Sequence, residues 1–427
     1  MTNRLIIFSI YPLERLDYVL RFVFFHLAGI EYRVVNDLSE INTSDWVINY
    51  SDLEFPEGGF QILPDGSLSS GEKPAIPDSS LNWREPGSLP ETLDVFSFIF
   101  FHLSRVDEFD PDVMDEHDRV LARNTWLGKQ DLLQVPVVDM IVERWFKLFN
   151  QKFQTDHFVV RMNYKPSVTI DVDQLYAYRR KPLHRWLGSL MRDILKGRLN
   201  RVWQRLKVLR GGKDPYDLLN EMILGSRANN LDVKIFFLIS GLSRFDRQIG
   251  LRSEDFEKLG EEVEIGLHPS YLSTQNPVQF HREKKTLEEL TGREIISSRF
   301  HYLRLKVPVS YQLLCQEGIT HDYTLSWSDE IGFRAGTCHS FQYYDLEREA
   351  TTELWIHPII AMDVVLKNTL RLDPQRAVDQ VNHLIDKCRA FRGEATIIWH
   401  NSSFDKTEDW SGWEKVFERI LANMATK

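Results

Sequence analysis

Short apolar runs recur along the chain from residue 168 onward, and most are separated by longer segments with apolar positions at helical spacing. Such runs are typical of buried strands, and the segments between them are typical of amphipathic helices. The strand candidates are 168–172, 234–240, 263–268, 295–303, 319–325, 354–362 and 395–400, and the helix candidates are 214–229, 251–260, 277–291, 308–317 and 374–391. This alternation predicts an α/β fold with parallel strands, and about seven such units favour a barrel over an open sheet.

The N-terminal part of the chain has a less regular pattern. It contains a strand candidate at 4–10 and apolar helix candidates at 93–103 and 137–149. A chain of 427 residues has room for two or three domains of about 150 residues each. We therefore expect a smaller N-terminal α/β domain over residues 1–160 and the barrel over residues 161–427.

The first strand of the regular region ends in two carboxylates. The run Val168-Thr169-Ile170-Asp171-Val172-Asp173 begins with β-branched residues, and Asp171 and Asp173 are two positions apart. On a strand they point to the same face, where they repel each other unless a cation or a shared proton relieves them. The simpler alternative is a strand followed by an Asp-rich turn.

Other strand candidates also carry polar residues at or near their ends. These residues are His268, Arg299 with His301, Asp322 and His400. A single histidine is more often structural than catalytic, but the carboxyl ends of parallel strands converge in a barrel. One Asp and two His form a common zinc set with an open position, and a second Asp and a third His would supply a base and an acid.

These motifs, taken in order, resemble those of polysaccharide deacetylases, the family 4 carbohydrate esterases. The resemblance covers about residues 165–405 and rests on Thr-Ile-Asp-Val-Asp, Gly-Leu-His-Pro-Ser at 266–270, Arg299, Asp322 and the terminal Trp-His-Asn at 399–401. It implies a distorted (β/α)7 barrel, a divalent metal that is usually zinc, and hydrolysis of an N- or O-acetyl group on a sugar. The stretch Gly-Phe-Arg-Ala-Gly-Thr at 332–337 is similar to a subgroup of bacterial deacetylase-like proteins with an extra N-terminal domain.

The resemblance also implies a metal-ligand set. Asp173 and His268 match two ligands, but the position of the family's second metal histidine is occupied here by Leu272. His301 is the candidate replacement, because it lies in the next strand candidate and shares a face with Arg299.

In the acid–base roles that the resemblance implies, Asp171 is the general base and Arg299 orients it. His400 is the general acid, and Asp322 tunes it. The family usually has adjacent aspartates, whereas this chain spaces them Asp-x-Asp. The reverse assignment of Asp171 and Asp173 therefore stays open.

Composition bounds the setting of this chemistry. The net charge of −10 argues against a general nucleic-acid binder. The three cysteines, Cys315, Cys338 and Cys388, are far apart and odd in number, which favours a reducing compartment. No apolar run approaches 18 residues, and no export signal is visible, so we expect a cytoplasmic protein.

A basic insertion interrupts the acidic chain at about 179–213. It holds twelve Lys or Arg residues and one acid, Asp193, so the rest of the chain carries a net charge of −21. Its apolar residues recur at helical spacing, with a break near Gly197. Either the helices of 185–210 contact an anionic membrane surface or anionic glycan, or their apolar face packs on the barrel.

Three other functional classes compete with the deacetylase. A non-catalytic glycan-binding or scaffold barrel is favoured by Leu272. An amidohydrolase is opposed by the absence of any His-x-His, and a serine hydrolase by the absence of Gly-x-Ser-x-Gly. If the protein is a cytoplasmic deacetylase, it would meet its substrate as a nucleotide sugar or as a lipid-linked precursor of a cell-envelope glycan.

Overall fold

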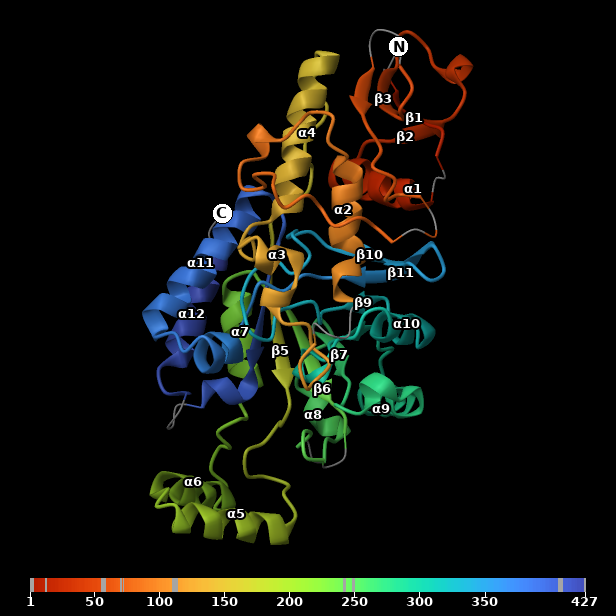
Figure 1. The fold of residues 1–427 in the computed structure, drawn as a ribbon. Helices are drawn as coiled ribbons and strands as arrows, with labels where there is room; N and C mark the ends of the chain where they lie inside the picture. The colour runs from red at the N-terminus through yellow and green to blue at the C-terminus, as the bar shows by residue number, and fades with distance from the viewer. Residues whose placement is uncertain are drawn as a thin grey trace.

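The computed structural model contains two separate β-sheets, with helices packed around them (Figure 1). It describes residues 4–11, 14–54, 59–69, 71, 73–109, 114–240, 243–247, 250–405 and 410–425. The class is mixed α/β, as the alternating pattern predicts.

The smaller sheet lies in the N-terminal part of the chain. Its strand order is β2-β1-β3-β4, and all three pairs are parallel. The strands are β1 (Leu5–Ser9), β2 (Tyr32–Val35), β3 (Trp46–Tyr50) and β4 (Phe60–Ile62), and the helices of this part are α1 (Glu14–Leu20), α2 (Val95–Ser104), α3 (Trp126–Lys129) and α4 (Val137–Phe153). Every residue of β1 is buried, which explains the apolar run at the start of the chain.

The larger sheet has nine strands in the order β10-β11-β9-β8-β7-β6-β5-β13-β12. All neighbours are parallel except the β10–β11 hairpin. The strands are β5 (Lys165–Val172), β6 (Asp232–Leu238), β7 (Glu264–His268), β8 (Ser297–Ser298), β9 (His321–Asp322), β10 (Phe341–Asp345), β11 (Ala350–Ile356), β12 (Ala361–Met362) and β13 (Glu394–His400). The sheet curls, with β10 and β12 at its edges among the described residues, and closure into a (β/α)7 barrel stays a prediction.

Helices connect most of these strands. They are α7 (Leu219–Ala228), α8 (Ser253–Glu257), α9 (Pro277–Thr291), α10 (Val309–Gln316), α11 (Pro374–Ala390) and α12 (Trp413–Ala425). Asn276 and Asp373 cap α9 and α11 with their side chains, and a proline follows each cap, which is a strong local signal for a helix start. Between β5 and α7 the basic insertion forms a hairpin of α5 (Leu183–Leu195) and α6 (Leu199–Leu209), which projects from the rest of the molecule (Figure 1).

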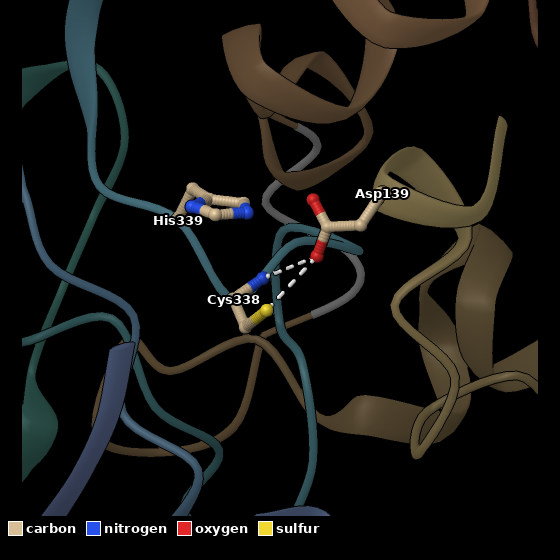
Figure 2. A group of neighbouring side chains, drawn as sticks. All are labelled: Asp139, Cys338 and His339. Carbon is tan, nitrogen blue, oxygen red and sulfur yellow. Dashed lines mark hydrogen bonds between the residues drawn. The ribbon is translucent and has the colours of Figure 1, made fainter. Parts of the chain in front are cut away.

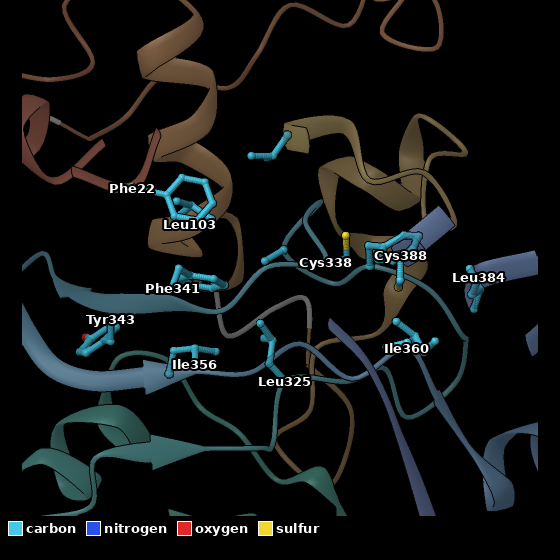
Figure 3. Close-up of a cluster of buried hydrophobic side chains, with 14 of the residues drawn as sticks. Phe22, Leu103, Leu325, Cys338, Phe341, Tyr343, Ile356, Ile360, Leu384 and Cys388 are labelled. Carbon is cyan, nitrogen blue, oxygen red and sulfur yellow. The ribbon is translucent and has the colours of Figure 1, made fainter. Parts of the chain in front are cut away.

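One apolar core runs through both parts of the chain. Phe22 and Leu103, from the N-terminal part, belong to the same buried cluster as Phe341, Ile356 and Ile360 around the larger sheet (Figure 3). The packing is thus continuous across residue 160, and a division into two domains at that residue stays a prediction.

The segment 332–337, the Gly-Phe-Arg-Ala-Gly-Thr stretch, joins the two parts by polar contacts. The Arg334 guanidinium donates to both oxygens of Glu108, at 2.9 and 2.7 Å, and Arg105 donates to the same carboxylate at 2.5 Å. All three side chains are buried. Burial alone would raise the pKa of Glu108, but Arg105 and Arg334 lower it to about 2. Gly336 has a φ of +65°, and a Cβ there would lie 3.0 Å from Val137, so this position suits glycine.

We predict that Arg334→Met destabilises the fold by about 3 kcal/mol, because it leaves part of a buried carboxylate charge unpaired. The measurement is the free energy of unfolding from denaturant titration. The matched control is Arg376→Met, which removes an ion pair to Asp373 from a side chain that is 77% exposed, and exposed pairs contribute at most about 1 kcal/mol. Equal losses in the two variants would contradict the structural role of Arg334.

Candidate active site

The carboxyl ends of three parallel strands and the turn after a fourth meet in a pocket of about 500 Å³. Asp171 and Asp173 reach it from β5, His268 from the end of β7, His301 from the turn after β8, and His400 from the end of β13. Of the residues selected at the strand ends from the sequence, Asp171, Asp173, His268, His301 and His400 line this pocket, whereas Arg299 and Asp322 do not.

Arg299 holds Asp171 in place. Its guanidinium is fully buried and donates to Asp171 Oδ1 at 2.6 Å, to Thr169 Oγ1 at 2.6 Å and to the Tyr323 carbonyl at 2.9 Å. The guanidinium also lies 4.5 Å from the centroid of the Phe236 ring. A carboxylate that accepts a charge-assisted hydrogen bond of this kind keeps a fixed direction.

His268 presents one ring nitrogen to the pocket. Its Nδ1 lies 2.5 Å from the Arg299 carbonyl oxygen. Because a carbonyl oxygen only accepts hydrogen bonds, Nδ1 carries the proton, and in the neutral ring Nε2 has the free lone pair. Nε2 lies 3.3 Å from Asp173 Oδ1 and 3.9 Å from Asp171 Oδ2.

His301 is oriented in the same way by a carboxylate. The chain leaves the ladder after the short strand β8 and turns sharply, with Tyr302 at a φ of 64°. His301 Nδ1 lies 2.9 Å from Asp246 Oδ1, and Nε2 lies 3.6 Å from Asp173 Oδ1. Asp246 is itself fixed by the Tyr271 amide, which donates to Oδ1 at 3.0 Å. Burial alone would lower the pKa of His301, but Asp173 and Asp246 raise it to about 9.

Asp173 lies between the two histidines. One ligand atom each from Asp173, His268 and His301 lies within 4.8 Å of the others. Asp173 Oδ1 is buried and accepts no hydrogen bond, although both Nε2 atoms face it. Burial alone would raise the pKa of Asp173, but His301 and His268 hold it well below its ordinary value. An unsatisfied carboxylate oxygen facing two oriented imidazoles fits a divalent cation such as Zn²⁺.

His400 is paired with Asp363 instead of Asp322. Its Nδ1 lies 2.7 Å from Asp363 Oδ1, and its amide donates to Oδ2 at 2.8 Å. Its Nε2 faces Asp173 Oδ2 at 4.0 Å. Burial alone would lower the pKa of His400, but Asp363, with Asp173 and Asp171, raises it to about 10. The ring therefore carries both protons at neutral pH.

The expected partnership of Asp322 with His400 does not match this geometry. The buried Asp322 carboxylate accepts from the Thr324 amide at 2.9 Å and from the Thr324 hydroxyl at 2.6 Å, and burial raises its pKa to about 6. Asp363 directly follows β12, so the strand-end rule could have found it. Asp246 lies eight residues beyond β6, and its sequence position gives no comparable signal.

Leu272 supplies no ligand in this arrangement. It follows β7 in an exposed turn, and 54% of its surface is accessible to solvent. His301, which comes from a different strand end, takes the place beside Asp173 and His268. The geometry thus agrees with the predicted substitution of His301, while its metal role stays a prediction.

A second group of possible metal ligands lies where the two parts of the chain meet. Asp139 of α4 approaches Cys338 and His339 (Figure 2). Asp139 accepts hydrogen bonds from the Thr337 hydroxyl at 2.6 Å, the Cys338 amide at 2.9 Å and the Cys338 thiol at 3.1 Å. His339 Nε2 lies 3.1 Å from the Phe391 carbonyl. These bonds fix α4 to the segment 332–339 and account for the group without a metal.

Comparison with known proteins gives a match to a family model and a similarity to solved structures. Residues 5–154 match the model of a family of unknown function, DUF7033. Among solved structures, a candidate polysaccharide deacetylase from Mycobacterium smegmatis is similar, with 14% sequence identity and a TM-score of 0.40 over 62% of this chain and 84% of that chain. No curated protein matches. The functional proposal therefore rests on the geometry of the site.

We predict that the purified protein binds about one Zn²⁺ per chain and that Asp173→Ala and His301→Ala each lose it, because each removes one of three ligands. Metal content by elemental analysis is the measurement. His321→Ala is the control, since its ring contacts His357 at 3.0 Å and does not line the pocket. Full zinc content in His301→Ala would show that His301 is not a ligand.

Proposed function

We propose that this protein is a metal-dependent hydrolase that removes an acetyl group from an N- or O-acetylated sugar or glycan. The observation that carries the proposal is that a possible metal-ligand set, a candidate base and a candidate acid converge in one pocket. Asp173, His268 and His301 face one point, and Asp171 and His400 lie beside it. This convergence agrees with the site that the resemblance to family 4 carbohydrate esterases implies. We also propose that the curled sheet belongs to the (β/α)7 barrel that the same resemblance implies.

The metal site is assigned to Asp173, His268 and His301. A bound divalent ion would polarise the acetyl carbonyl and lower the pKa of a water molecule from 15.7 to about 7. The protein contributes the direction of the lone pairs, because the Arg299 carbonyl and Asp246 each hold an Nδ1 proton. This leaves Nε2 of both rings directed at Asp173.

The proton transfers are assigned to Asp171 and His400. Asp171, aimed by its hydrogen bond from Arg299, accepts a proton from the attacking water. His400 donates the proton on Nε2 to the leaving nitrogen or oxygen of the sugar, and Asp363 fixes its ring by holding Nδ1–H. Asp363 thus takes the tuning role expected of Asp322. Each acid–base role typically contributes about 10²–10⁴ in rate.

The neighbours of the two aspartates support one assignment of the roles of base and metal ligand. Asp171 Oδ1 is taken by Arg299, whereas Asp173 Oδ1 accepts no hydrogen bond and faces both Nε2 atoms. The side chain of Asp173 is also the more accessible of the two, at 34% against 3%. These contacts support Asp171 as the base and Asp173 as the ligand.

A carbohydrate substrate suits the pocket entrance. Phe245 and Tyr302 line the pocket, and Phe245 stacks on Tyr271 with ring centroids 3.9 Å apart. Aromatic faces of this kind pack against the apolar face of a sugar ring, with polar groups fixing its orientation.

The alternative of a non-catalytic glycan-binding protein was favoured by Leu272, and the position of His301 removes that reason.

We also propose that the α5–α6 hairpin contacts an anionic membrane surface. Its apolar residues face solvent instead of packing on the sheet, and Leu183, Leu195 and Trp203 are 72%, 81% and 66% exposed. The same hairpin carries the basic cluster, which complements anionic lipid headgroups. Within the described parts of the chain, no helix is long and apolar enough to cross a membrane.

Asp171→Asn and His400→Ala are each expected to reduce acetate release by about 10²–10⁴-fold while zinc content is retained, because neither residue is assigned as a ligand. Acetate release from a panel of N- and O-acetylated oligosaccharides is measured together with metal content, with His321→Ala as the control. Loss of zinc in Asp171→Asn would reverse the two aspartates. No acetate release by the zinc-loaded wild type from any substrate would favour the non-catalytic alternative.

For the hairpin, we expect co-sedimentation with anionic vesicles at low salt, weaker binding at high salt, and little binding to neutral vesicles. Replacing Leu195 and Trp203 by Ser should weaken binding, because the apolar face inserts at headgroup level. Leu224→Ser on α7, where the side chain is 65% exposed, is the matched control. Absence of binding to anionic vesicles at low salt would remove the membrane contact.

A further inference from the structure

A second cleft opens beside the candidate active site. Its volume is about 520 Å³, and it lies between one side of α5 and the segment 243–247 after β6. Gln174 and Arg247 line both this cleft and the active-site pocket. A molecule that reaches from one cavity to the other would therefore pass these two residues.

Among the described residues, the cleft is lined by five cationic side chains and by no acidic one. The five are Lys181, Arg185, Arg192, Arg244 and Arg247. They come from two stretches of the chain, because the basic insertion of 179–213 supplies Lys181, Arg185 and Arg192 and the segment 243–247 supplies Arg244 and Arg247. Helix α5 contributes Arg185 and Arg192 on the side that also presents Gly188 and Ser189.

None of these five cations forms an ion pair within the described part of the chain, whereas nearby arginines do. Arg205 is paired with Asp193 at 2.8 Å, and Arg179 with Asp217 at 3.2 Å. Asp193, the single acid of the insertion, is thus used to fix α6 to α5 and does not neutralise the cleft. The positive charge in the cleft is left available for a ligand.

Burial and the cationic surroundings lower the pKa of Lys181. Burial, together with the charges of Arg205, Arg247 and Arg185, lowers its pKa to about 8, even though Asp214 acts in the opposite direction. Asp214 accepts hydrogen bonds from the amides of Ala177 and Tyr178, at 2.7 and 2.9 Å, so it is committed to the backbone. Like charges that line one cleft repel each other, and an anion that binds among them relieves this repulsion.

We infer that this cleft is an anion subsite of the substrate-binding region and that it takes a phosphate or diphosphate group attached to the acetylated sugar. The inference rests on the proposed function, because it names the substrate class of that pocket. Five cations exceed what a single carboxylate requires, and guanidinium forks suit the oxygens of phosphate groups. A sugar carrying such a group would place its acetylated end beside Asp173 and its phosphate beside Arg247.

The test uses inorganic pyrophosphate as the probe and calorimetric titration of the full chain as the measurement. The titration is made on the wild type and on His301→Ala, whose proposed metal site is disrupted, so that binding to a metal ion is separated from binding to the cleft. We expect both proteins to bind pyrophosphate with the same affinity. Because this readout needs no acetate release, it can fail or succeed independently of the proposed enzyme activity.

The deciding variants remove charge inside and outside the cleft. Arg185→Gln with Arg192→Gln should weaken binding by about tenfold or more, because each variant removes a charge-assisted contact. Arg198→Gln removes one charge on the same hairpin outside the cleft, and it should leave the affinity within about twofold. Equal weakening by both sets, unchanged affinity in the double variant, or no pyrophosphate binding by the wild type in about 50 mM salt would overturn the inference.

Two competitors then distinguish the source of the group. One is a soluble nucleoside diphosphate, and the other is a diphosphate-bearing lipid in otherwise neutral vesicles. Displacement of pyrophosphate by the first alone indicates a nucleotide-linked sugar, and displacement by the second indicates a lipid-linked sugar. Displacement by neither would overturn the assignment to a phosphate-linked substrate.

Discussion

The buried guanidinium of Arg299 is the point on which the rest of the site depends. A buried charge is stable only if hydrogen bonds replace its contacts with water. Each guanidinium nitrogen of Arg299 has an acceptor, and the three acceptors are Asp171, Thr169 and the Tyr323 carbonyl. The same residue uses its own carbonyl to fix the ring of His268. One residue therefore sets the direction of the proposed base and of one proposed ligand, and it ties β5 to the segments that follow β8 and β9.

The other charges of the site occur as oriented pairs. Asp246 holds His301, and Asp363 holds His400, each through Nδ1. In both pairs the carboxylate comes from a different element than the imidazole, so the fold must be complete before the ring direction is fixed. Asp173 is the remaining carboxylate, and no arginine or lysine of the described residues pairs with it. That imbalance is what a divalent cation would correct, and the same reasoning, with the signs reversed, applies to the cationic cleft next to it.

Sequence patterns predicted the parts of the fold that local chemistry determines. The long apolar strands β5, β6, β7 and β13 and the capped helices α9 and α11 lie close to their expected positions. The expected strands over 295–303 and 319–325 shrink to the two-residue strands β8 and β9, and the chain leaves the ladder after each of them. The antiparallel β10–β11 hairpin was not predicted, because the strand candidates omit residues 341–345 and hydrophobic periodicity does not give strand direction.

The same limit applies to the site residues. Asp171, Asp173, His268, His301 and His400 could be selected because each lies at or near the end of a strand candidate. The same rule could have found Asp363 as well as Asp322, but it could not decide which of the two partners His400, since only the side-chain directions separate them. The break in the basic insertion was predictable from Gly197, but its solvent-exposed apolar face was not, because periodicity does not say what covers a face.

The most direct test of the central claim is zinc K-edge X-ray absorption of the zinc-loaded protein, which reports the atoms bound to the ion. The account predicts nitrogen and oxygen neighbours at about 2.0–2.1 Å and no sulfur, because Asp173, His268 and His301 supply none. A sulfur neighbour at about 2.3 Å would contradict it, since the other possible group in the described chain contains Cys338.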